Sequence, residues 1–276
     1  GGESLAYGVS ADGSGVVGGA YNAASQWRAF RWTQATGMQD LGTLPGSSWS
    51  EAYGVSADGS VVVGSTIVGG RHRAFRWTQA TGMQDLGTLD RESFAYGVSA
   101  DGSVVVGRAD TARQSYAFRW SAAGGMQDLG TLGGSWSEAM GVSADGSVVV
   151  GVSQNAARLA RAFCWTQATG MQDLGTLGGS RSEARGVSAD GSVVVGFAQN
   201  AAGQDRAFRW TPEGGMEDLN QTYARLLTDG SVLSVATAIS PNGRYIVGLG
   251  YNAATRRYEG YLLDTVPEPA SLMALG

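Results

Sequence analysis

The chain has 276 residues, of which 43% are hydrophobic, 16% are charged and 44 are glycine. This apolar share is enough for a sizeable core and argues against wholesale disorder. The 24 acidic residues outnumber the 19 basic ones and give a net charge of −5, which argues against a protein that binds the phosphate backbone of nucleic acids.

The rarest residues exclude several kinds of site. Cys164 is the one cysteine and His72 the one histidine, so the chain has no internal disulfide, no CxxC motif and no HExxH motif. No phosphate-binding loop, dinucleotide fingerprint or GxSxG motif occurs either. We therefore predict no catalytic residue, no cofactor and no metal site. We expect Cys164 to be buried and inert, and His72 to lie in a solvated loop.

Three strings recur along nearly the whole chain. GVSADGS or a variant begins at Gly8, Gly54, Gly97, Gly141 and Gly186, with a degenerate copy at Ala238. AFRW or AFCW ends at Trp32, Trp77, Trp120, Trp165 and Trp210, and GM(Q/E)DL follows each of them. The strings define six repeats of about 45 residues, near 1–44, 45–89, 90–132, 133–177, 178–219 and 220–265, followed by a tail at 266–276.

Each repeat predicts two hairpins. In the first, β-branched residues flank an Asp-Gly turn, which we interpret as a type I′ turn with structural aspartates rather than calcium ligands. The second joins AFRWT to MQDL by a four-residue loop, which would place Arg31 opposite Asp40 in a cross-strand pair worth about 0.2–1 kcal/mol. A helix is expected only at 222–227.

Four strands in about 45 residues is the size of a propeller blade. The sequence therefore predicts an all-β fold, a β-propeller of six four-stranded blades, over residues 1–265. The Phe and Trp of AFRW would fill the space between blades. The sixth repeat has no GM(Q/E)DL string after its third strand, so the last blade should lack its outer strand. A β-solenoid is the alternative architecture.

The loops between the second and third strands differ most from repeat to repeat. Variable loops on a fixed scaffold are typical of binding surfaces in repeat proteins, and aromatic and arginine side chains are good recognition residues. Ordinary drift between duplicated repeats would give the same variation. The candidate ligand-binding residues of these loops are Tyr21, Trp27, Arg71, Arg113, Tyr116, Arg158, Tyr251 and Arg256.

The repeats resemble the HAF family of extracellular bacterial repeats through G(V/I)SADG, AFxW and MxDLGTLGG. The histidine of the family's His-Ala-Phe triplet is replaced here, by Arg28, Arg73, Tyr116, Arg161 and Arg206. The tail, VPEPASLMALG, resembles the PEP-CTERM sorting signal, with Pro267, Glu268 and Pro269 as its motif. That resemblance implies processing by a sorting enzyme of the exosortase type, and membrane contact only through a downstream segment that this sequence lacks.

Together these features predict a protein that is not an enzyme. We expect a secreted or cell-surface repeat protein that acts as a binding and structural module of the bacterial envelope or extracellular matrix. The resemblances imply an extracellular or outer-surface location in a Gram-negative bacterium. An exopolysaccharide or another matrix or surface component is the expected partner. The alternative is a glycan-active propeller hydrolase with a carboxylate cluster at its centre.

Overall fold

The computed structural model describes residues 2–266 and 272–275. Almost all of its regular structure is β-strand, and helix is confined to α1 (Leu219–Thr222) and the 3-10 turn η1 (Ala224–Leu226). The chain divides into two compact units, one of residues 1–130 and 136–146, the other of residues 131–135 and 147–276. No helix in the described part of the chain is long and apolar enough to cross a membrane.

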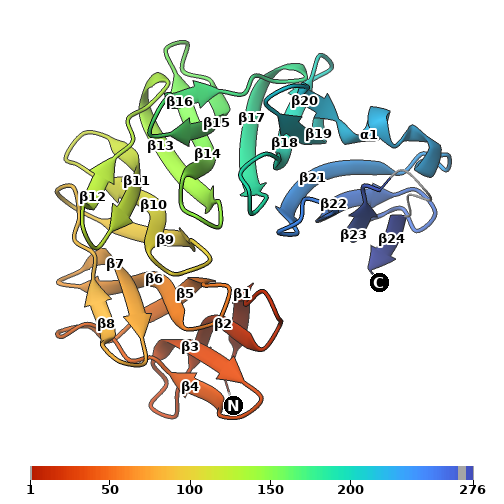
Figure 1. The fold of residues 1–276 in the computed structure, drawn as a ribbon. Helices are drawn as coiled ribbons and strands as arrows, with labels where there is room; N and C mark the ends of the chain where they lie inside the picture. The colour runs from red at the N-terminus through yellow and green to blue at the C-terminus, as the bar shows by residue number, and fades with distance from the viewer. Residues whose placement is uncertain (1, 267–271, 276) are drawn as a thin grey trace. The chain divides into compact units, whose positions relative to one another are not determined.

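The first compact unit contains the first three repeats and most of the strand that opens the fourth. Its strands are β1 (Ser4–Val9), β2 (Gly15–Tyr21), β3 (Trp27–Thr33), β4 (Gly37–Asp40), β5 (Ser50–Val55), β6 (Val61–Val68), β7 (Arg71–Thr78), β8 (Gly82–Asp85), β9 (Ser93–Val98), β10 (Val104–Asp110), β11 (Ser115–Ser121), β12 (Gly125–Asp128) and β13 (Gly133–Val142). Within each repeat the strands pair antiparallel in chain order (Figure 1).

The second compact unit continues the pattern. Its strands are β14 (Val148–Asn155), β15 (Ala160–Thr166), β16 (Gly170–Asp173), β17 (Gly178–Val187), β18 (Val194–Asn200), β19 (Asp205–Thr211), β20 (Gly215–Asp218), β21 (Val232–Ile239), β22 (Tyr245–Asn252), β23 (Arg257–Asp264) and β24 (Leu272–Leu275). Helix α1 and turn η1 lie between β20 and β21. The helix thus starts earlier than the expected 222–227, because the Asp218 side chain caps it by accepting the Asn220 amide hydrogen at 2.8 Å.

The fold is all-β, with small sheets arranged as in a propeller. The prediction of six separate blades, however, is wrong. Four separate four-stranded sheets are formed by β1–β4, β5–β8, β17–β20 and β21–β24. Strands β9–β12 are not a further separate sheet, because β13 joins β11 through the parallel pair Ser115 and Trp136.

The last repeat also differs from its prediction. We expected its sheet to lack the outer strand. Instead β24 pairs antiparallel with β23, from Gly260 with Leu275 to Leu263 with Leu272. Residues of the tail therefore supply the fourth strand that the GM(Q/E)DL string supplies elsewhere. The sheet edge of β23 has backbone groups to satisfy, and β24 pairs with them.

The register of the second hairpin is one residue away from the expected one. Thr33 pairs with Gly37, and Phe30 with Asp40, so the loop has three residues and Arg31 faces Gln39. Gly37 has a φ of 66°, which lets it close the shorter loop. The expected pair of Arg31 with Asp40 is therefore wrong. Asp40 lies instead 3.9 Å from the guanidinium of Arg28.

The Asp-Gly turn is structural, as predicted, but it is not type I′. Gly59 has a φ of 71°, whereas Asp58 is not among the residues with positive φ. The Asp58 carboxylate accepts the Ser56 hydroxyl at 2.6 Å and the Ser60 amide at 2.9 Å. These hydrogen bonds, that of Ser56 first, lower the pKa of Asp58 to about 2. The carboxylate therefore stays ionised and braces the turn.

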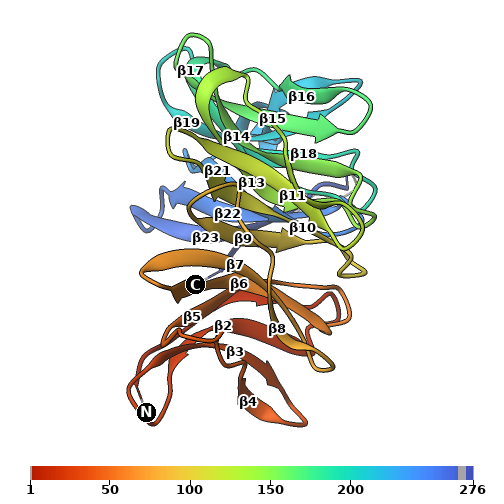
Figure 2. The same ribbon diagram turned by 90° about the vertical axis from the view of Figure 1, so that its left-hand side faces the viewer.

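The core lies between consecutive sheets. Phe75 and Trp77 of the second repeat pack against Val17, Ala29 and Leu41 of the first, and Phe75 is fully buried. Phe118 of the third repeat packs in the same way against the second, and Phe208 of the fifth against the fourth. Figure 2 shows the sheet β1–β4 lying along β5–β8. The apolar face of one sheet is buried only by the apolar face of the neighbouring sheet, so each of these repeats depends on its neighbour for burial.

Polar contacts repeat at the same junctions. Ser50 accepts the amide hydrogen of Ala29 at 3.0 Å and donates to the carbonyl of Gly42 at 2.6 Å, which ties the second repeat to the first. Equivalent bonds are made by Ser93, Ser137 and Ser182. The AFRW arginine adds a third link, since Arg31 donates to the Gly59 carbonyl of the next turn at 2.7 Å. Cys164 stands at this arginine position in the fourth repeat and is buried, as predicted.

Candidate functional site

A solvent-open groove lies in the second compact unit, beside the sheet of the last repeat. Its volume is about 580 Å³, within the range of roughly 300–1,000 Å³ of small-molecule sites. Its lining comes from the last residue of the turn before β19, from the start of β19 and from strands β21, β22 and β23. The lining residues are Gln204, Asp205, Arg206, Val232, Ser234, Val235, Leu249, Tyr251 and Tyr258.

Two tyrosines supply the aromatic surface of this groove. Tyr251 on β22 and Tyr258 on β23 face each other across the hairpin, with ring centroids 5.8 Å apart and planes inclined by 66°. Tyr258 is 66% exposed, and the neighbouring Leu249 is 44% exposed. An exposed ring of this kind leaves a face free for an apolar surface of a ligand.

Polar groups of Gln204 and of the first two residues of β19 are held in place by hydrogen bonds. Arg206 donates to the Gln204 side chain at 2.7 Å. Asp205 accepts a hydrogen bond from Arg181 through Oδ2 at 2.7 Å, while its Oδ1 is buried and has no hydrogen-bond partner in the described structure. The groove thus presents a guanidinium and an amide together with the tyrosine rings, polar groups suited to hydroxyl groups.

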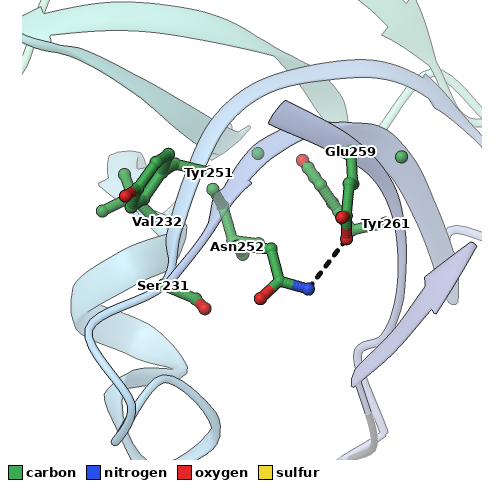
Figure 3. Close-up of a pocket in the computed structure, with 9 residues that line it drawn as sticks. Ser231, Val232, Tyr251, Asn252, Glu259 and Tyr261 are labelled. Atoms are coloured by element: carbon green, nitrogen blue, oxygen red, sulfur yellow. Dashed lines mark hydrogen bonds between the residues drawn. The ribbon is translucent and has the colours of Figure 1, made fainter. Parts of the chain in front are cut away.

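A smaller pocket adjoins the groove and shares Val232 and Tyr251 with it. Figure 3 shows Asn252 and Glu259 pointing toward each other across this pocket, and Asn252 donates to the Glu259 carboxylate at 2.8 Å. Thr255 donates to the other carboxylate oxygen at 2.6 Å. These two bonds, that of Thr255 first, lower the pKa of Glu259, so the group is an ionised acceptor rather than a proton donor.

Only some of the predicted ligand-binding residues line a pocket or contact another aromatic ring. Tyr251 lines the groove. In the first compact unit, Tyr21 and Trp27 contact each other edge to face, with centroids 4.9 Å apart, and Tyr21 lines a hollow of about 150 Å³ together with Arg28 and Met38. Tyr116 is half-buried and its hydroxyl donates to the Gln114 side chain.

The four predicted arginines, by contrast, are exposed, one at the start of a strand and three in turns. Arg71 begins β7, and Arg113 lies in the turn before β11. Arg158 and Arg256 occupy turn positions with φ of 62° and 57°, a backbone conformation that few residues other than glycine adopt readily. None of the four lines the groove, the smaller pocket beside it or the hollow at Tyr21.

His72 does not lie in a solvated loop as expected. It is on β7, half-buried, with its ring between Trp49, at 5.4 Å, and Phe94, at 4.5 Å. Its backbone amide donates to the Glu92 carboxylate at 3.2 Å. The prediction failed because the β6–β7 loop is only two residues long, so His72 belongs to the strand and faces the next repeat.

The sequence reasoning missed Tyr258, Asn252 and Glu259. All three lie in the β22–β23 hairpin, which the repeat alignment had already marked as variable. The available signal was that no other repeat has Tyr258 or Glu259 at the equivalent position, whereas Asn252 recurs as Asn22, Asn155 and Asn200. The sorting motif Pro267, Glu268 and Pro269 lies outside the described residues. Within those residues, no group of three or more His, Cys, Asp or Glu side chains is placed to hold a metal ion.

The fold is similar to that of known propeller proteins. An oligogalacturonate lyase in complex with manganese has a TM-score of 0.64 at 15% identity, over 97% of this chain and 75% of that one. The oligogalacturonate lyase from Vibrio parahaemolyticus has a TM-score of 0.62 at 13% identity, over 98% and 76%. TolB from Acinetobacter baumannii has a TM-score of 0.55 at 15% identity, over 78% of this chain and 53% of that one, so the chain spans about half of that TolB.

These likenesses place the chain in the class of β-propeller folds. At such low identity they establish the fold alone. No family model matches the chain, and no curated protein sequence matches it.

Proposed function

We propose that this protein is a non-enzymatic binding module for a polysaccharide, and that the groove beside the last repeat holds the sugar. The observation that carries the proposal is the pair of half-buried Tyr251 and exposed Tyr258, which lines the groove together with Gln204 and Arg206. The C–H faces of sugar rings pack on aromatic rings, and their hydroxyls pair with amide, guanidinium and carboxylate groups. An exopolysaccharide or another matrix component has both the apolar C–H faces and the hydroxyl groups that such a groove would bind.

The chemistry of the carboxylates favours binding over hydrolysis, the alternative function. A glycosidase needs a carboxylic acid that holds its proton near neutral pH beside a second, ionised carboxylate. Glu259 has a lowered pKa, and Asp205 forms an ion pair with Arg181. The hydrogen bonds to Glu259 therefore do not favour a protonated acid there. The lyases of similar fold act on oligogalacturonate by their names, which makes acidic oligosaccharides a sensible part of any ligand screen.

Glycan-array screening followed by calorimetric titration tests this proposal. We expect at least one oligosaccharide to bind, and Tyr258→Ala to weaken it by about tenfold or more, since a hot-spot aromatic contributes well over 1 kcal/mol. Tyr245→Ala is the matched control, because Tyr245 lies on β22, is 37% exposed and does not line the groove. We expect it to bind like the wild type.

Two results would overturn the binding proposal. One is an array on which no glycan binds, or on which Tyr258→Ala binds as tightly as the wild type. The other is turnover of an oligosaccharide that is lost in Glu259→Gln or Asp205→Asn, which would favour the hydrolase. Circular dichroism of each variant shows that a loss is not caused by unfolding.

We also propose that the full-length protein is exported and sorted at the envelope of a Gram-negative bacterium by an exosortase-type enzyme. The support is the resemblance of the tail, residues 266–276, to a PEP-CTERM signal together with the HAF-like repeats. Changing Pro267, Glu268 and Pro269 to alanine in the full-length protein should alter its cellular fraction and C-terminal mass in a host with that enzyme. An unchanged fraction and mass would contradict the sorting role.

A further inference from the structure

The first strands of three consecutive sheets in the first compact unit carry a row of aromatic rings. Tyr7 on β1, Tyr53 on β5 and Tyr96 on β9 follow one another, and both neighbouring pairs have centroids 5.8 Å apart. The ring planes of the two pairs are inclined by 61° and 51°, so the three tyrosine rings are tilted against one another and are not stacked in parallel. Phe94 extends the row beside Tyr96, at 6.2 Å. We call these four residues the tyrosine row.

Glu51 lies within this row and is surrounded by neutral donors. Its carboxylate accepts hydrogen bonds from Tyr53 at 2.9 Å and from the Trp27 indole at 3.0 Å. Burial, and then the charge of Glu51 and a hydrogen bond to it, raise the pKa of Tyr7. In the part of the chain that the structure describes, no cationic side chain forms an ion pair with Glu51. Its negative charge is therefore hydrogen-bonded but not neutralised.

The row is open to solvent at β1. Tyr7 is 48% exposed, and Leu5 and Val9 on the same strand are 43% and 61% exposed. A half-buried carboxylate beside accessible aromatic faces attracts a cation in two ways, by its charge and through the ring quadrupoles. Planar guanidinium groups fit such a setting best, because they stack on rings and bind carboxylates through two N–H groups.

The chain already places guanidinium groups in this environment. At the far end of the row, the Arg108 guanidinium lies 4.7 Å from the Phe94 ring centroid, with Asp110 at 3.2 Å. In the second compact unit, Glu183 holds the position of Glu51 in its repeat, and Arg185 holds that of Tyr53. There Arg185 donates to Glu183 at 2.9 Å. In the fifth repeat an arginine of the same chain therefore pairs with the glutamate, whereas the second repeat has a tyrosine at that position.

We propose that the tyrosine row and Glu51 form a binding site for a guanidinium group, supplied by an arginine side chain of a partner polypeptide. This site is separate from the groove of the last repeat and does not depend on the proposed sugar binding. The arginine would lie over Tyr7 and Tyr53 and pair with the Glu51 carboxylate.

Calorimetric or NMR titration of the intact protein with N-acetyl-Gly-Arg-Gly-amide tests the site, at low ionic strength because salt screens exposed charges. We expect saturable binding by the wild type and no saturation with the citrulline analogue, which has the same shape without the charge. Glu51→Gln should weaken binding about tenfold or more. Glu213→Gln, which changes an exposed glutamate in the β19–β20 turn, should leave it unchanged.

Tyr53→Arg gives a second, independent test. It copies the fifth repeat, where arginine and glutamate two residues apart coexist in a folded strand, so the variant should fold and fill the site from within. We expect it to abolish peptide binding while the melting temperature stays near that of the wild type. The proposal is overturned by absent binding, by equal binding of the citrulline peptide, or by unchanged binding in Glu51→Gln or Tyr53→Arg. It is also overturned if the same peptide with lysine in place of arginine binds more tightly.

Discussion

Replacing Gly18 with alanine should destabilise the protein by about 3 kcal/mol or more, at the upper end of overpacking effects. Gly18 lies on β2, and a Cβ atom there would be 1.9 Å from the carbonyl oxygen of Leu5 on β1. Because that oxygen belongs to the backbone, only separation of the two strands can relieve the overlap. Glycine at this position recurs, with equivalent distances of 1.9 to 2.0 Å at Gly64, Gly107, Gly196 and Gly248.

Gly15 provides a matched control in the same strand. A Cβ atom at Gly15 would be 3.5 Å from its nearest neighbour, the Ser10 hydroxyl oxygen, and the second repeat has Val61 at the equivalent position. We expect Gly15→Ala to be neutral or stabilising by up to about 1 kcal/mol, since alanine leaves the unfolded chain less conformational freedom than glycine does. Urea unfolding monitored by circular dichroism measures both changes. Equal stability of the two variants would contradict the steric argument.

Phe75→Ala should cost about 3–5 kcal/mol, the usual range for removing a fully buried phenylalanine. Phe75 has no exposed surface and fills the space between the first two sheets, against Val17, Ala29 and Leu41. Neither sheet can close over the loss without disturbing its own strand pairing, so a cavity should remain. At roughly 2–4 °C per kcal/mol, the melting temperature should fall by about 6–20 °C.

Phe30 is the corresponding residue of the first repeat and serves as the comparison. It is 4% exposed and borders the hollow of about 150 Å³ formed with Tyr21 and Met38. Because one side of its ring meets this hollow rather than packed side chains, Phe30→Ala should cost clearly less, about 2 kcal/mol. A loss at Phe30 equal to that at Phe75 would show that packing between sheets does not dominate the core.

The repeat period carried most of the information about the fold. It located the strands of GVSADGSVVVG and AFRW, the buried phenylalanines and the structural role of Asp58. It could not set the hairpin register at Arg31, because a three-residue and a four-residue loop fit the same letters and only the positive φ of Gly37 selects between them. The strand formed by Leu272–Leu275 was also hidden, since these residues share no string with the other outer strands.

The candidate sites were less accessible to sequence reasoning. A search for residues that differ between repeats found Tyr251 but passed over Tyr258 and Glu259, which it did not weigh one by one. Glu51 escaped notice because glutamate recurs at this position, in Glu138 and Glu183, and recurring residues were interpreted as structural. These glutamates differ in their hydrogen-bond partners, which are Tyr53 for Glu51 and Arg185 for Glu183. The sequence does not show these hydrogen bonds, which appear only in the folded structure.

The junctions between repeats have a consequence for how such a chain can change over generations. Ser50, Ser93, Ser137 and Ser182 each make the same two bonds to the preceding repeat, so one junction is chemically interchangeable with the next. When one whole repeat is duplicated or deleted, the new junction has the same serine and the same backbone partners as the old ones. When only part of a repeat is lost, the serine or its backbone partners are missing. Recombination between the near-identical strings can therefore lengthen or shorten the array in whole steps, while the variable hairpins remain free to diverge.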